Sequence, residues 1–202
     1  MIQNKTIILS SPQTKSKVSV EEALLKRRSI REYKDESLSQ KQISQILWAA
    51  QGITDSEWGA RTSPSAGALY PLEVYLVTKK IKGIKPGVYQ YLPEEHKLKN
   101  IFEGDISDKL TQAALGQTFI TEAEMNLVIT AFYTRTTRKY GERGIRYVHM
   151  EAGHVAQNVY LQVVALGLGA VVIGAFSEKE VKKILNLSEE ETPLYIIPVG
   201  KI

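Results

Sequence analysis

The sequence predicts an α+β fold, in which an antiparallel or mixed sheet is surrounded by helices. Serine-initiated helices, short β-branched or alternating runs and a hairpin-like pair of such runs together predict this class. The 202 residues contain no internal repeat, linker or low-complexity segment, so we expect a single domain covering residues 1–202.

Two helices are expected near the N-terminus, each beginning after a serine. Ser19-Val20-Glu21-Glu22 has the spacing of a capping box, and the helix that follows should end near an arginine cluster at residues 27–31. The second helix begins after Ser39, with Gln42 three residues later, and Gly52 is a C-terminal stop. Its helically spaced apolar positions are Ile43, Ile46, Leu47 and Ala50.

The strands are predicted by alternating or continuous apolar runs of strand length. We expect them at residues 73–78, 87–92, 97–101, 126–133, 171–173 and 194–199. The second and third should form a hairpin that turns at residues 93–96. A loop rich in Ser, Gly and Ala is expected at about residues 55–70.

Three further helices are expected in the second half of the chain. A short one spans residues 105–115 and is stopped by Gly116, and another follows the Ser177–Glu180 capping box to about Leu185. The longest runs from about Arg143 to Leu166. Its apolar stripe is Ile145, Val148, Ala152, Val155, Val159 and Val163.

Composition limits the classes of function. The net charge of +4 is too modest to indicate nucleic-acid binding by itself. Cysteine is absent, so disulfides, thiolate nucleophiles and thiolate metal sites are excluded. The N-terminus lacks the apolar core of a signal peptide, and no apolar run approaches the ~18 residues of a membrane helix. We therefore expect a cytoplasmic protein without a membrane or nucleic-acid partner.

The arginine cluster has two possible roles. Cations at a helix C-terminus complement its dipole and bind the last carbonyls. Alternatively, Arg27 and Arg31, which would share a face if both were helical, form a phosphate clamp to which Ser29 adds a hydroxyl donor. Spacing alone does not separate these two roles.

Two glycine-containing stretches also suggest a ligand. The small residues of 62–71 predict either a tight surface loop or a floor that a flat ligand can approach closely. Residues 167–176 superficially resemble a dinucleotide fingerprint, but a helix precedes them and a strand follows, which is the reverse of the required order. The glycines here instead end the long helix and, at Gly174, bring backbone near a ligand.

A metal site is not expected, because His149 and His154 lie about 140° apart around their helix. No G-x-S-x-G elbow supports a serine triad. The basic, aromatic stretch at 133–147 is expected to be a solvated loop, and it lacks a recognised nucleic-acid module. The more specific interpretation of this stretch is a loop that faces the substrate, with Lys139 or Tyr140 as a proton donor or acceptor.

Together these stretches resemble the nitroreductase family of flavin enzymes. The resemblance rests on R-R-S-I-R at Arg27, P-S-A-G-A-L-Y-P at Pro64, A-L-G-L-G-A-V-V-I-G-A-F at Ala165, and P-V-G-K near the end. It covers the chain from about Val20 to Lys201. Within the family, the stretch from Arg138 to Asn158 looks most like the SagB-type branch, which includes dehydrogenases that oxidise azolines to azoles in modified peptides.

The resemblance implies a nitroreductase-like fold, with a central, mostly antiparallel sheet flanked by helices, and an obligate-type homodimer with FMN at its interface. The helix at Arg143 would form much of that interface. The FMN phosphate and ribityl chain would be held by Arg27, Ser29 and Arg31, by Arg28 mainly through its backbone, and by Lys201 near the phosphate.

The resemblance also implies the surroundings of the flavin ring. Loop residues from the other subunit would line it, namely Pro64, Ser65, Ala66, Gly67 and Leu69. Its reactive edge would lie near Ile173, Gly174 and Ala175. Lys139 and Tyr140 resemble the Lys-Tyr pair of azoline dehydrogenases. Ala68 and Leu69–Tyr70 stand where many nitroreductases carry Asn and Gln, so side-chain bonds to the ring edge would be missing.

The implied reaction is the NAD(P)H-dependent reduction of a small organic acceptor, such as a nitro compound or quinone, or the oxidation of a SagB-type substrate. The alternative is a flavin-binding sensor or carrier without turnover.

Overall fold

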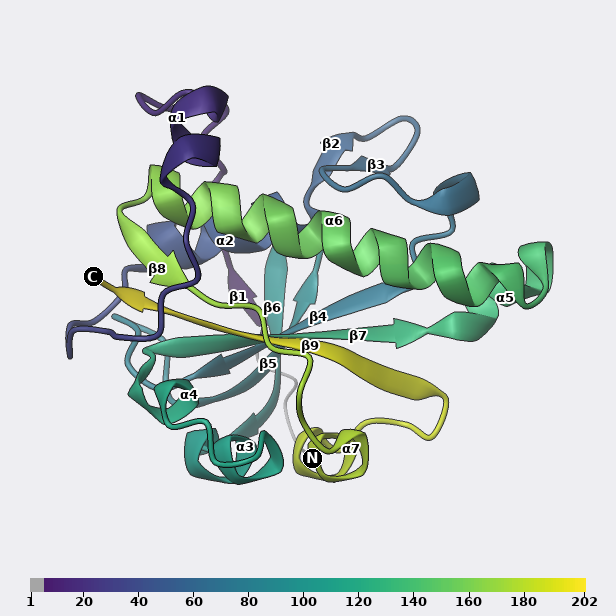
Figure 1. The fold of residues 1–202 in the computed structure, drawn as a ribbon. Helices are drawn as coiled ribbons and strands as arrows, with labels where there is room; N and C mark the ends of the chain where they lie inside the picture. Colours follow the sequence, from purple (N-terminus) through teal and green to yellow (C-terminus); the bar gives the residue numbers. More distant parts are fainter. Residues whose placement is uncertain (1–5) are drawn as a thin grey trace.

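A seven-stranded antiparallel sheet forms the centre of the computed structural model, which describes residues 6–202 (Figure 1). Its strand order is β1-β6-β5-β4-β7-β9-β8. These strands are β1 (Thr6–Ile8), β4 (Leu72–Thr78), β5 (Gly87–Leu92), β6 (Lys97–Glu103), β7 (Met125–Phe132), β8 (Leu168–Ala170) and β9 (Glu191–Lys201). A separate small hairpin consists of β2 (Ile53–Asp55) and β3 (Ala60–Arg61).

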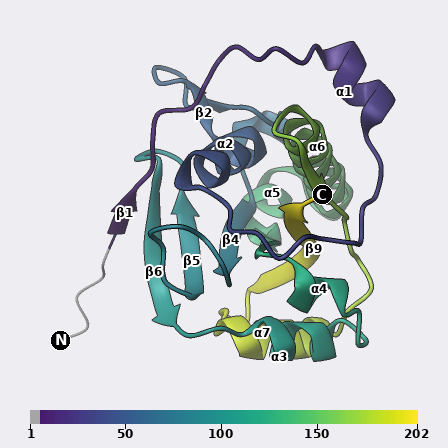
Figure 2. The same ribbon diagram turned by 90° about the vertical axis from the view of Figure 1, so that its left-hand side faces the viewer.

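Helices cover both faces of the sheet (Figure 2). They are α1 (Val20–Lys26), α2 (Gln40–Gln51), α3 (Ser107–Ala113), α4 (Phe119–Glu122), α5 (Tyr133–Tyr140), α6 (Arg143–Ala165) and α7 (Glu178–Leu185), with a 3-10 turn, η1, at Ala66–Ala68. The predicted class, a mostly antiparallel sheet flanked by helices, is confirmed.

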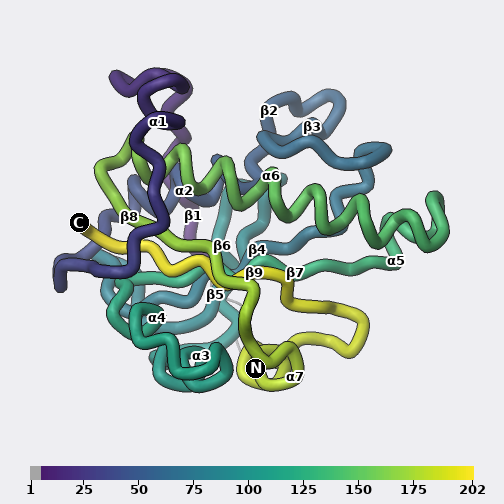
Figure 3. The backbone as a smooth tube through the Cα atoms, in the orientation of Figure 1, coloured from purple at the N-terminus to yellow at the C-terminus, as the bar shows by residue number. Residues whose placement is uncertain are grey.

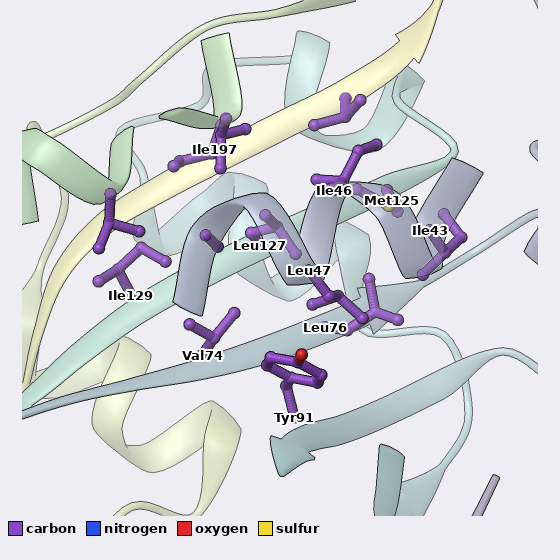
Figure 4. Close-up of a cluster of buried hydrophobic side chains, with 14 of the residues drawn as sticks. Ile43, Ile46, Leu47, Val74, Leu76, Tyr91, Met125, Leu127, Ile129 and Ile197 are labelled. Atoms are coloured by element: carbon purple, nitrogen blue, oxygen red, sulfur yellow. The ribbon is translucent and has the colours of Figure 1, made fainter. Parts of the chain in front are cut away.

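Each face of the sheet has its own hydrophobic core, because successive strand residues point to opposite faces. On one face, Leu127 and Ile129 of β7 pack in the core that α2 and α6 cover (Figure 4). Val128, between them, packs on the other face with residues of α3 and α7. The nearly continuous apolar sequence of β7 therefore reflects burial on both sides.

The capping serines form the contacts that their spacing predicts. Ser19 Oγ accepts a hydrogen bond from the Glu22 amide at 3.1 Å, and Ser177 Oγ accepts one from Glu180. The reciprocal capping box is complete at Ser39, where the Gln42 side chain also accepts from the serine amide. In the predicted stripe of α6, Val148 and the later members are buried, whereas Ile145 is 44% exposed.

Three local predictions are wrong. The stretch expected to be a solvated loop begins with helix α5, where Thr136 is buried while the basic residues face outward. The loop expected at 55–70 contains the β2–β3 hairpin. The strand expected at 171–173 lies at 168–170, because β8 pairs with the end of β9, and Ile173 forms only an isolated bridge with Ile196. Such pairings depend on distant residues that local patterns do not contain.

Within residues 6–202, no helix is long and apolar enough to cross a membrane.

Candidate functional site

The chain that follows α1 runs along the edge of the sheet, next to β8 and the end of β9 (Figure 3). The Ile30 amide donates to the Ala170 carbonyl at 2.9 Å, and the Lys34 amide donates to the Lys201 carbonyl at 2.9 Å. These bonds bring the arginine cluster and Lys201 to the same sheet edge. We call residues 27–31 the arginine segment.

The three arginines of this segment have different surroundings. The Arg28 guanidinium donates to the carbonyls of Leu25 and Arg27, at 3.0 and 2.7 Å, and so completes the end of α1. Arg27 lies over the Tyr160 ring at 5.1 Å, and Arg31 lies over the Phe119 ring at 5.7 Å. Neither Arg27 nor Arg31 forms an ion pair with another described residue. The helix-end role considered for the cluster therefore belongs to Arg28, whereas the phosphate clamp stays a prediction for Arg27 and Arg31.

Arg27 and Arg31 do not share a helix face, because the helix ends at the arginine cluster, as predicted. Helix α1 ends at Lys26, and Arg27 is its C-cap, with a ψ of 123° that leaves the helical region. Arg31 lies in the extended segment beyond it. The physical reason is that Ile30 bonds to the sheet edge instead of continuing the helical ladder.

Gly174 leaves an open surface beside this segment. Among residues 6–202, a Cβ atom added there would have only Tyr195 Cε1 within 4 Å, at 3.8 Å, and the backbone does not adopt a positive φ. Neither packing nor backbone conformation within the chain requires glycine at this position. Ile173, in contrast, is buried, so its side chain belongs to the core. The Ala175 carbonyl accepts a hydrogen bond from Gln117 at 3.0 Å.

The loop at 64–70, which we call the serine loop, forms a second group of candidate residues. Ser65 Oγ donates to Glu151 Oε2 at 2.5 Å and accepts from the Tyr70 amide at 2.9 Å. Its hydroxyl is thus occupied inside the protein, and Ser65 can reach a ligand only through its backbone. Gly67, Ala68 and Tyr70 have φ values of 64°, 54° and 43°, so this turn is held in the left-handed region.

Lys139 and Tyr140 lie against the tip of the serine loop. A Cβ atom added to Gly67 would lie 2.8 Å from the Tyr140 hydroxyl and 2.9 Å from Lys139 Nζ. The structure therefore brings the two candidate catalytic residues together with the predicted ring-lining loop. Tyr140 also packs edge-on against Tyr147 of α6, with ring centroids 5.1 Å apart.

Glu151, which the sequence analysis did not identify, supports the serine loop from α6. Its side chain is 2% exposed, and burial raises its pKa to about 7, opposed by the hydrogen bond from Ser65, the nearby Gln51 amide and the charge of Arg61. In the described part of the chain, Glu151 Oε1 and Gln51 Nε2 have no partner within hydrogen-bonding geometry. The signal in the sequence that could have identified Glu151 was its position, as a polar residue, beside the apolar stripe of α6.

The two groups of residues lie along α6 but do not meet. The arginine segment contacts Tyr160, and the serine loop contacts Glu151. Nine residues of helix separate these positions, which is about 14 Å along the axis. In Figure 1, α1 and the β2–β3 hairpin stand apart along the same helix.

The donor set of the arginine segment suits a phosphate. Two guanidinium groups without carboxylate partners, a serine hydroxyl and the nearby Lys201 can bind a dianion. The open backbone at Gly174 gives a flat group room beside that anchor. The residues present thus fit FMN.

Comparison with known proteins identifies the family. Residues 24–201 match the model of the nitroreductase family. A protein of Methanocaldococcus jannaschii that is named as a nitroreductase is 50% identical over 91% of each chain. A crystal structure of a nitroreductase-named protein from Ralstonia eutropha superposes with a TM-score of 0.86 at 30% identity, covering 100% of this chain and 91% of that one.

A third relative is named for the processing of microcin B17. The microcin B17-processing protein McbC of Escherichia coli is 28% identical over 79% of this chain and 61% of McbC. The solved E. coli microcin synthetase McbBCD complex contains a chain that matches with a TM-score of 0.75 at 26% identity, over 99% of this chain and 79% of that one.

The chain therefore belongs to the nitroreductase family, as its motifs predicted. It is an oxidoreductase of the FMN-dependent kind that defines this family.

Proposed function

We propose that the protein is a homodimeric enzyme that binds FMN at its subunit interface, accepts a hydride from NAD(P)H and reduces a small organic acceptor. The observation that carries the proposal is the pair of guanidinium groups, Arg27 and Arg31, which have no carboxylate partner among the described residues and lie beside the open backbone at Gly174.

The chain's own residues have distinct tasks in this proposal. Arg27, Ser29 and Arg31 bind the phosphate and ribityl chain, with Lys201 nearby, while Arg28 holds the end of α1 in place. Ile173 and Ala175 fix the backbone on either side of Gly174, along which the ring lies. FMN, when bound, supplies the redox chemistry.

The distance between the arginine segment and the serine loop supports a dimer. A two-fold axis across α6 pairs the helix antiparallel with its twin, so the Tyr160 end of one helix faces the Glu151 end of the other. Each arginine segment then meets the serine loop of the other subunit, whose contact residues are Pro64, Ser65, Ala66, Gly67 and Leu69. The exposed face of α6 suits such pairing, since Met150 is 53% exposed and Gly153 has nothing within 4 Å of an added Cβ.

Lys139 and Tyr140 act on the substrate in this arrangement, because they stand at the tip of the serine loop. The Tyr140 hydroxyl or the Lys139 ammonium donates a proton to a reduced acceptor. In the oxidation of a substrate, the Tyr140 phenolate or the neutral Lys139 amine takes a proton instead. Together with the similarity to McbC, a protein that processes microcin B17, this pair favours a second candidate function, the oxidation of a SagB-type peptide substrate.

The first test is the cofactor itself. Purified protein should be yellow, with absorbance near ~450 nm, and should release FMN on denaturation. Either NADH or NADPH should bleach the bound flavin, and a quinone or nitroaromatic should restore its colour. A colourless protein that does not take up FMN would overturn the proposal. Binding of FMN without reduction by NAD(P)H would instead favour a sensor or carrier.

The second test distinguishes the role of Arg27 in FMN binding from the role of Arg28. A charge-assisted hydrogen bond contributes roughly 1.5–3 kcal/mol, so Arg27→Ala should weaken FMN binding about ten-fold or more. Arg28→Ala is the matched control, because its guanidinium bonds to carbonyls of α1 and should change FMN affinity little. Equal, negligible losses in an FMN titration of both variants would contradict the phosphate clamp.

A further inference from the structure

Tyr160 of α6 joins two segments that are distant in sequence. Its hydroxyl accepts a hydrogen bond from the Val172 amide at 2.9 Å and lies 3.0 Å from Ser29 Oγ. The Tyr160 oxygen accepts a hydrogen bond from Val172, so the phenol proton remains available for a hydrogen bond to Ser29. The Arg27 guanidinium lies over the same ring at 5.1 Å. One side chain thus contacts the arginine segment through Ser29 and Arg27, and the backbone before Gly174 through Val172.

The geometry of the strand edge explains why Val172 needs this partner. The amides of Val171 and Ile173 donate to Pro198 and Ile196 of β9. Alternate amides of an extended segment point to opposite sides, so the Val172 amide faces away from β9 and toward α6. Within residues 6–202, the Tyr160 hydroxyl is its hydrogen-bond acceptor.

We propose that Tyr160 is a positioning residue that holds the arginine segment and the Val172–Gly174 backbone at a fixed separation, and thereby sets both the affinity for FMN and the surroundings of its ring. This inference rests on the proposed function. In it, the phosphate is bound by Arg27 and Ser29 and the ring lies along Gly174, so the two contacts of Tyr160 are at the two ends of one cofactor. Ordering both ends before binding reduces the entropy lost on binding.

The test uses Tyr160→Phe, which keeps the ring beneath Arg27 and removes only the hydroxyl. Apoprotein is titrated with FMN by flavin fluorescence, and the absorbance spectrum and midpoint potential of the bound flavin are recorded. Because two hydrogen bonds are lost and the Val172 amide is left without its partner, we expect about ten-fold weaker binding. The spectrum and the midpoint potential of the bound flavin should shift as well, because the backbone beside the ring is released.

Two further variants make the result specific. Tyr89→Phe is the matched control, because the Tyr89 hydroxyl donates one hydrogen bond, to the Lys85 carbonyl at 3.0 Å, and β5 is separated from β8 by three strands of the sheet. It should leave FMN affinity within about two-fold of wild type. Ser29→Ala removes the other partner of Tyr160 and should weaken binding in the same direction. The double variant should lose less affinity than the product of the two single losses, because both act on one contact.

A Tyr160→Phe protein that binds FMN as tightly as wild type, with an unchanged spectrum and potential, would overturn the positioning role while leaving the proposed function intact. Wild-type protein that binds no FMN would overturn both. If Tyr160→Phe does not fold, Ser29→Ala decides the question through the spectrum and midpoint potential of the bound flavin, since the loss of a phosphate contact alone would lower affinity without changing either. Ser29 lies in an exposed segment, so this variant should fold. An unchanged spectrum and potential in Ser29→Ala would then contradict the proposal.

Discussion

The arginine segment and the serine loop, the two groups that α6 carries, are built in different ways. The arginine segment is fixed by backbone bonds to the edge of a rigid sheet, and its guanidinium groups remain available. The serine loop lies away from the main sheet and contains three left-handed residues. It is fixed by the buried carboxylate of Glu151 and, at Tyr70, by hydrogen bonds from Arg61 and Arg135. A binding anchor can therefore have a stable scaffold and free charges, whereas a ring-covering loop depends on a group that titrates.

The largest expected effect is on the pH dependence of stability, because Glu151 holds the serine loop. Since burial raises the pKa of Glu151 from its ordinary 4.5 to about 7, the folded protein keeps a proton between these values that the unfolded chain releases. The stability from this group is complete below pH 4.5 and is lost as pH rises through 7. From pH 5 to 8, wild type should lose roughly 3 kcal/mol relative to Glu151→Gln, which cannot titrate.

Urea denaturation of both proteins at several pH values measures this difference. Glu191 and Glu124, whose pKa values burial also raises, are common to the two proteins, so their contributions cancel. Parallel stability curves would show that folding does not raise the pKa of Glu151, and the contrast between the arginine segment and the serine loop would then rest on backbone strain alone.

The next largest effect is expected from a substitution at the tip of the serine loop, and a substitution at a second glycine is its control. Gly67→Ala places a methyl group against Lys139 and Tyr140, in addition to the strain of a positive φ. Gly59→Ala imposes the strain alone, because Gly59 has a φ of 63° and nothing within 4 Å of an added Cβ. Strain should cost about 1 kcal/mol in each variant.

Turnover distinguishes the two glycine variants. Only Gly67→Ala should also lower kcat, since it displaces the candidate proton donors. Equal turnover in both variants would show that Lys139 and Tyr140 do not take part in the reaction. The serine loop would then have a purely structural role.

The sequence predicted the arginine segment more fully than the serine loop, for physical reasons. Capping serines and strand patterns are local, so α1 and α2 were predictable, and the grouping of Arg27 with Lys201 followed from motifs in order. The partners of Ser65 were not predictable, because Glu151 lies 86 residues away and only the packing of α6 brings them together. Likewise, nothing in R-R-S-I-R shows that Arg28 closes α1 while its neighbours do not.

Family resemblance named residues of both groups, but it did not show how they are held. Glu151 and Tyr160, which hold them, became apparent only from the hydrogen bonds.

The smallest effect is expected from a substitution in α6, between the arginine segment and the serine loop. It tests whether two copies of α6 pack together and so bring the segment of one subunit to the loop of the other. Gly153 lies in the middle of α6, has no positive φ, and would meet nothing within 4 Å if it carried a Cβ. In an isolated chain, Gly153→Ala should raise the free energy of unfolding by about 1 kcal/mol, because alanine is the better helix former.

Against a closely packed twin helix, the same methyl group should instead weaken association. Sedimentation should therefore show a dimer that dissociates at higher concentration in this variant than in wild type, and FMN affinity should fall with it. A variant that is simply more stable, with unchanged association and FMN binding, would mean that α6 does not pack closely against its twin at Gly153. The serine loop would then have to reach an arginine segment by another route.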